Sequence, residues 1–147
     1  MSIEREDFYQ RLRKKIRDWA ETEAGKNYKY AEYLLLVPDF FHLLCKLALD
    51  KDIPVKEKAK LAGAIVYFVS PVDVIPEALV GPVGYVDDLA LSAYVLNGII
   101  NKTDPEIVLK HWAGEGDILA LIKRVLEKAD EMVGSGLWKK LKGLVAD

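Results

Sequence analysis

Residues 61–86 form a long, mostly apolar run that contains neither lysine nor arginine. A run of this length is long enough to cross a lipid bilayer as one helix. Its composition argues against that arrangement, because three prolines, three glycines and two carboxylates interrupt the apolar side chains. Lipid-exposed backbone cannot lose so many hydrogen bonds. We therefore expect a buried helix followed by a buried loop.

The rest of the chain carries apolar residues at helical spacing, and no segment shows the alternation typical of a strand. A chain of 147 residues is long enough to bury its own core without disulfides or a metal. The sequence thus predicts an all-α, single-domain bundle of residues 1–147, with about six to seven helices around a buried central hydrophobic helix and a Pro/Gly-rich acidic loop. Amphipathic helices at 5–25 and 104–145 should flank a core at about 38–100.

Local signals predict where the first helices begin and end. The first helix should run from Arg5 to Ala24 and stop at Gly25, a common residue after helix ends. A break is expected before Pro38, because proline is tolerated only in the first turn of a helix. The helix at 54–70 is apolar on every side in its second half, so we expect it to be the central helix.

The later helices are predicted in the same way. Asp87 should be the N-cap of a helix over 88–101, and Asp104 should be the N-cap of a helix that begins at Pro105. Residues 115–133 form the next amphipathic helix. After a Gly-Ser-Gly hinge, the last segment places an apolar face opposite its lysines; that face consists of Leu137, Trp138, Leu141, Leu144 and Val145.

The carboxylates of the central loop each have a structural interpretation. Ser70, Pro71 and Asp73 have the form of a capping box, in which the Asp73 carboxylate reaches back to the Ser70 amide. Pro76 and Glu77 repeat the pattern in a first helical turn, where negative charge is favourable. In this interpretation each acid stabilises the fold by about 1 kcal/mol and binds no ligand.

The same acids also suit a divalent cation, since oxygen ligands held in fixed positions are what Mg²⁺, Mn²⁺ and Ca²⁺ require. Asp39 and His42 lie one helical turn apart and could complete such a cluster, whereas His111 is a weaker candidate. A metal-dependent hydrolase acting on phosphate esters is the corresponding enzyme. The candidate ligands are Asp39, His42, Asp73, Glu77, Asp87 and Asp88.

Residues 38–97 resemble the YkvA-like family, a domain of unknown function (number 1232) found in bacteria and archaea. The residues that carry the resemblance are Asp39, Tyr67, Pro71, Asp73, Pro76, Gly84, Tyr85, Asp87, Asp88 and Leu89. Glu77 departs from the family pattern, which has aspartate there; the charge is kept and the reach is longer. The resemblance implies a small helical protein, in some members associated with membranes, and it implies no particular activity.

Two classes of function therefore remain open. The first is a non-enzymatic module that binds a protein partner or a membrane surface, with Leu137, Trp138, Leu141 and Leu144 as a candidate interfacial face. The alternative for this face is that it packs on the core. The second class is the cation-binding protein or hydrolase. The sequence has no P-loop and no Gly-x-Ser-x-Gly or His-Glu-x-x-His motif, so an enzyme is the less favoured class.

Charge and cysteine content narrow the list of partners. The net charge of −2 gives no global reason to expect nucleic acid, whose binding depends on clustered positive charge. The basic cluster at residues 11–17 is expected to be a solvated face or a contact with an acidic partner or lipid. Cys45 is the only cysteine and lies in an apolar run, which suits a reducing cytoplasm. We expect a cytoplasmic protein, peripheral at the membrane if it meets one; a homo-oligomer is compatible with its apolar content.

Overall fold

The helical periodicity of the sequence is realised as an all-α structure. In the computed structural model, residues 2–69 and 85–144 are described, and within these ranges the chain forms helices and no strand. The helices are α1 (Ser2–Ala20), α2 (Glu23–Asn27), α3 (Ala31–Leu34), α4 (Val37–Ala48), α5 (Val55–Val69), α7 (Tyr85–Lys102), α8 (Pro105–His111), α9 (Ile118–Val133) and α10 (Ser135–Leu144). The prediction of an all-α bundle is confirmed.

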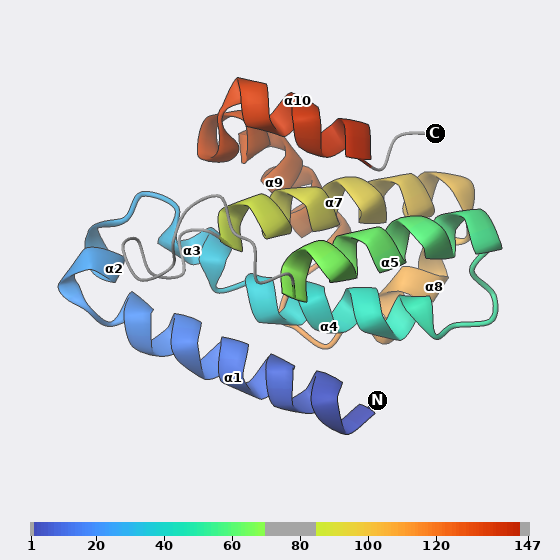
Figure 1. The fold of residues 1–147 in the computed structure, drawn as a ribbon, viewed down its shortest axis with the longest axis horizontal. Coiled ribbons are helices and arrows are strands. Elements are labelled where there is room, and N and C mark those ends of the chain that lie inside the picture. Colours follow the sequence, from blue (N-terminus) through green and yellow to red (C-terminus); the bar gives the residue numbers. More distant parts are fainter. Residues whose placement is uncertain (1, 70–84, 145–147) are drawn as a thin grey trace.

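The central helix of the bundle is α7. It contacts α3, α4, α5, α8, α9 and α10 (Figure 1). Leu89 and Leu91, which point to different sides of the helix, are both completely or almost completely buried, as are Leu96 and Ile99. A helix with neighbours on several sides can bury residues around its whole circumference. The predicted buried central helix is therefore present, and it is α7.

The sequence predicted that the helix at 54–70 would be the central helix, and this part of the prediction is wrong. Its observed counterpart, α5, packs on α4 and α7 through Leu61 and Ala64. Ala62 and Gly63 are exposed, and Val66 keeps 63% of its surface accessible. The apolar sequence of α5 thus suggested more burial than is observed. Small residues on its outer face raise the hydrophobicity of the sequence but can remain exposed to solvent.

The end of the first helix also differs from the prediction. α1 ends at Ala20, and Thr22 then caps the short helix α2 by accepting a hydrogen bond from the amide of Gly25. Gly25 lies inside α2 and is buried, and a Cβ at this position would overlap the Trp19 carbonyl oxygen. This glycine therefore allows close backbone approach and does not terminate α1.

The amphipathic faces of α1 and α10 pack against opposite sides of the bundle (Figure 1). α1 lies along α4 and buries Leu12 and Ile16. α10 lies on α7 and α9 and buries Trp138 and Leu141, with the indole ring of Trp138 edge-on to Tyr94. The other predicted boundaries are close to those observed, including the break before Pro38 and the Asp104 cap, whose side chain accepts a hydrogen bond from the Glu106 amide.

Candidate functional site

Several residues of the predicted acidic site lie outside the described part of the chain. These are Ser70, Pro71, Asp73, Pro76, Glu77 and Gly84. Tyr85 is the first residue of α7. The capping boxes and the contribution of Asp73 and Glu77 to a cation site therefore stay predictions.

Asp87 and Asp88 belong to the first turn of α7. The prediction that Asp87 is the N-cap is wrong, because the helix begins two residues earlier, at Tyr85. The first turn still favours their negative charge, since the unpaired amides there carry partial positive charge. Asp88 is 4% exposed. Burial, with the neighbouring Tyr30 and the charge of Asp87, raises the pKa of Tyr28 to about 12.

Asp39 and His42 lie on one face of α4 and both meet Tyr9 of α1. The Tyr9 hydroxyl donates to Asp39 Oδ1 at 2.8 Å, and the rings of Tyr9 and His42 are 5.3 Å apart. Burial raises the pKa of Tyr9, and the hydrogen bond to Asp39 raises it further, because ionised tyrosine could not donate to the carboxylate. The two residues are thus adjacent as predicted, and Asp39 is engaged with α1.

No group of three or more His, Cys, Asp or Glu side chains that could hold a metal ion occurs within residues 2–69 and 85–144. Asp39, His42, Asp87 and Asp88 do not form such a group by themselves. A site with Mg²⁺, Mn²⁺ or Ca²⁺ would need the loop acids as well, and so it stays a prediction.

A small pocket opens beside Asp39, between α1 and the start of α4. Its volume is about 200 Å³, and its lining consists of Arg13, Ile16, Arg17, Leu35, Pro38 and Asp39. Two arginines one helical turn apart therefore line the same pocket as one aspartate. Arg13 also donates to the Tyr9 hydroxyl at 3.3 Å, so Arg13, Tyr9 and Asp39 form a hydrogen-bonded series across the α1–α4 contact. The pocket is charged, partly enclosed and floored by buried Ile16.

The middle of α1 carries a dense group of exposed cations, whereas the acids of this helix lie nearer its two ends. Its exposed cations are Arg11, Arg13, Lys14, Lys15 and Arg17, and no acidic residue occurs between Gln10 and Arg17. Lys14 forms an ion pair with Asp18 at 2.8 Å, which is exposed and worth little in water. Leu35, at the mouth of the neighbouring pocket, is 49% exposed. We call these five cations and Leu35 the α1 surface.

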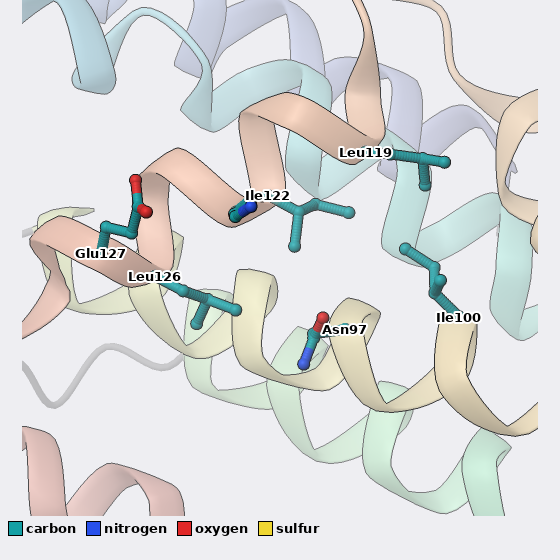
Figure 2. A pocket seen from close by; sticks show the side chains of 7 residues that line it. Asn97, Ile100, Leu119, Ile122, Leu126 and Glu127 are labelled. Atoms are coloured by element: carbon teal, nitrogen blue, oxygen red, sulfur yellow. The ribbon is translucent and has the colours of Figure 1, made fainter.

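A second hollow, of about 490 Å³, lies between α7 and α9. Figure 2 shows Leu119, Ile122 and Leu126 of α9 directed towards the α7 side of this groove, where Asn97 and Ile100 lie. The charged residues at its rim are Lys123 and Glu127, which have opposite sign and lie one turn apart on α9. The groove is largely apolar and brings together no constellation of catalytic groups.

His111 has a well-defined partner that the sequence did not indicate. Its Nε2 lies 2.7 Å from Asp50 Oδ2, which is also 3.3 Å from Lys110 Nζ, and the Asp52 amide donates to Asp50 Oδ1 at 2.7 Å. The hydrogen bond with His111, followed by that from the Asp52 amide, lowers the pKa of Asp50 to about 2. Both carboxylate oxygens are occupied, so this cluster fastens the end of α4 to the end of α8 and leaves little capacity for a ligand.

Glu57 is another buried acid that sequence reasoning did not single out. It is 3% exposed in the first turn of α5, and its Oε1 lies 3.5 Å from both Lys60 Nζ and Lys102 Nζ. Because Lys102 is the last residue of α7, this cluster joins α5 to α7. Its role is structural, since a buried carboxylate must be matched by cations.

Two members of the predicted interfacial face of α10, Trp138 and Leu141, are buried in the bundle, with 6% and 2% of their surface exposed. The side chains of Leu137 and Leu144 lie outside the described part. For Trp138 and Leu141 the structure thus adopts the arrangement that the sequence left as the alternative to an interfacial helix. Across the described residues, no helix combines the length and the apolar character needed to cross a membrane.

Comparison with known proteins places the resemblance in the middle of the chain. Residues 57–94, from α5 to the middle of α7, match the model of a family described as "Protein of unknown function (DUF1232)". This confirms the predicted family resemblance over a shorter segment than residues 38–97, and Asp39 and His42 lie outside it. "Uncharacterized protein ORF9" of Methanothermobacter thermautotrophicus is 26% identical over 107 residues, which is 73% of each chain. No solved structure matches this chain.

Proposed function

We propose that this protein is a non-enzymatic module that binds anionic membrane surfaces peripherally, through the α1 surface. The observation that supports the proposal is the run of five exposed cations on one helix, uninterrupted by an acid. Clusters of four to eight basic residues on an amphipathic helix are typical of segments that bind anionic lipids. Leu12 and Ile16 fix the helix on α4, so its cations are held on the outside.

The charge distribution of the whole chain favours binding through the α1 surface over non-specific adsorption. The net charge is −2, so the positive charge of the α1 surface is local. Outside this face the molecule is net negative, and an anionic membrane would therefore repel other orientations of the protein. The attraction acts within a Debye length, about 8 Å at physiological salt, which matches side chains that project directly from a surface helix.

The expected strength is moderate. Each lysine or arginine near an anionic membrane contributes about 1 kcal/mol. Leu35 adds an apolar contact beside Arg13 and Arg17, since about half of its surface is accessible. Binding that rests on these terms should be reversible and weakened by salt, as expected for a peripheral protein.

The test is sedimentation with vesicles of phosphatidylcholine alone and with phosphatidylglycerol added. We expect binding only to the second kind, with a loss of affinity as salt rises. The double variant Arg11→Gln/Lys15→Gln removes two cations outside the pocket and should weaken binding by about 2 kcal/mol, or roughly 30-fold. Its melting temperature should stay close to that of the wild type, because both residues are exposed.

The matched control is Lys139→Gln/Lys140→Gln, which makes the same charge change on the exposed face of α10. We expect this variant to bind as the wild type does. If only the α10 variant lost vesicle binding, the binding face would lie on α10 instead of α1. Equal sedimentation with neutral and anionic vesicles, or none with either, would refute the proposal.

A further inference from the structure

The pocket between α1 and α4 is built from opposite charges that do not neutralise one another. Arg13, Arg17 and Asp39 all line it. No ion pair within 4.0 Å joins either arginine to Asp39 among the described residues, and Asp39 Oδ2 has no hydrogen-bond donor there. In the described part of the chain, Arg13 and Asp39 are linked only through the Tyr9 hydroxyl. The pocket that these two residues line together with Arg17 leaves room for a molecule.

The charges define the kind of molecule that would fit. A pair of arginines suits phosphate, because the planar guanidinium presents several N–H donors to its oxygens. The carboxylate opposes a simple anion and suits an ammonium group or another strong donor. Tyr9 holds Asp39 through Oδ1, and Oδ2, which lies beside Gly114, accepts no hydrogen bond from the described residues. The pocket is therefore suited to a zwitterion that has phosphate at one end and ammonium at the other.

The size of the pocket limits the ligand further. Its volume is about 200 Å³. This space accommodates a phosphate with a two-carbon amine. Leu35 lies in the lining with about half of its surface exposed, so a hydrocarbon chain attached to the phosphate would find an apolar contact there.

We infer that the pocket formed by Arg13, Arg17, Leu35 and Asp39 binds the phosphoethanolamine group, with the phosphate on the two arginines and the primary ammonium on Asp39. The group can come from phosphatidylethanolamine in a membrane or from free phosphoethanolamine. The lipid form of this inference rests on the proposed function, since it adds headgroup selectivity to charge-driven membrane binding. The free form does not depend on it.

The experiment separates headgroup recognition from charge. Vesicles carry a constant fraction of phosphatidylglycerol, and phosphatidylethanolamine replaces phosphatidylcholine in one set. We expect about tenfold tighter binding to the ethanolamine vesicles, because the trimethylated nitrogen of choline has no N–H to donate to Asp39. In parallel, calorimetry with free phosphoethanolamine and phosphocholine should show binding of the first and weaker or no binding of the second.

Variants test which side chain binds each end of the ligand. Asp39→Asn removes the charge but keeps an acceptor for Tyr9, and it should abolish the preference for ethanolamine over choline. Arg17→Gln should weaken binding of free phosphoethanolamine at least tenfold. Arg11→Gln is the matched control on the same helix outside the pocket: it should weaken both vesicle sets equally and leave the preference and the calorimetry unchanged.

Each outcome bears on one proposal or the other. Binding to anionic vesicles without an ethanolamine preference, together with no heat from free phosphoethanolamine, would overturn the inference and leave the proposed function standing. Binding of free phosphoethanolamine that depends on Arg17 and Asp39, without vesicle binding, would support the pocket as a site for a soluble ligand and refute the membrane proposal. A preference that survives Asp39→Asn would contradict the assigned role of Asp39.

Discussion

The two helices nearest the ends of the described chain, α1 and α10, share an amphipathic pattern but differ in what surrounds their exposed cations. Both are amphipathic, with an apolar face packed on the bundle and cations on the outside. In α10 the apolar face contains a tryptophan that is buried against Tyr94, and Lys142 Nζ lies 5.3 Å from the centre of the Trp138 ring. In α1 the apolar anchor is aliphatic, and its cations adjoin a charged pocket and an exposed leucine.

This difference shows what an amphipathic pattern can and cannot establish. The pattern predicts that a helix has one face for an apolar neighbour. It does not say whether that neighbour is the protein or a membrane. For both helices the neighbour is the protein, so any membrane contact must use what remains exposed, and there α1 offers more charge and a pocket.

The largest expected effect concerns the anchor of α10. Trp138→Ala removes a side chain that is 6% exposed and its ring contact with Tyr94. We expect a loss of about 3–5 kcal/mol in the free energy of unfolding, typical of aromatic-to-alanine changes in a core. Urea denaturation measures it, with exposed Lys139→Ala as the control, expected within about 0.5 kcal/mol of wild type. A small loss at Trp138 would indicate that α10 is not held on the bundle.

The next effect concerns the anchor of α1. Ile16→Ala opens a cavity under a side chain that is 1% exposed, and it should cost about 2–5 kcal/mol. Ile16 also floors the pocket, so the same variant should weaken phosphoethanolamine binding, whereas Trp138→Ala should leave binding unchanged at temperatures where both variants are folded. If both variants bound phosphoethanolamine equally well, the pocket would not depend on the α1–α4 contact.

The features that the sequence predicted correctly depend on neighbouring residues. Asp104 caps the helix at Pro105 because a side chain two residues away meets a free amide. The break before Pro38 has an equally local cause. Asp87 was misassigned because three consecutive positions, Val86 to Asp88, are each compatible with a first helical turn, and only the observed start at Tyr85 decides between them.

The features that were not predicted depend on contacts between distant residues. The pair Asp50–His111 is separated by 61 positions, and the contact Tyr9–Asp39 by 30. No local pattern specifies either one. The phosphate-sized pocket likewise exists only once α1 has packed on α4. His42 was preferred to His111 as a candidate ligand because Asp39 lies one helical turn before it, whereas Asp50, the partner of His111, is 61 positions away in the sequence.

A third prediction compares two glycines. Gly25→Ala should destabilise the protein by about 1–3 kcal/mol, because the new Cβ meets the rigid backbone of Trp19 and Ala20. Gly136→Ala in α10 should instead stabilise by a few tenths to about 1 kcal/mol, since nothing lies within 4 Å of its Cβ and alanine favours helix. Thermal melts of the two variants should therefore move in opposite directions. A shift in the same direction would show that Gly25 is not a close-approach position.

The smallest effect is a pH dependence at the junction of α1 with the rest of the bundle. Burial, with Tyr30 and Asp87 nearby, raises the pKa of Tyr28 to about 12, and the ring of Tyr28 packs edge-on against Trp19 of α1. In the unfolded chain the pKa is about 10. The neutral ring therefore favours folding fully below pH 10, and this contribution is lost as pH rises from about 10 to about 12, because the unfolded chain ionises first.

Tyr28→Phe cannot ionise, so its stability should fall less than that of the wild type between pH 9 and pH 11, measured as the difference between two urea midpoints. Other groups titrate in the same interval, and the comparison with wild type removes their contribution. Tyr9→Phe is the companion variant, because burial and Asp39 raise the pKa of Tyr9 as well. If both variants lose stability as steeply as the wild type, the loss of stability at alkaline pH does not come from Tyr28 or Tyr9.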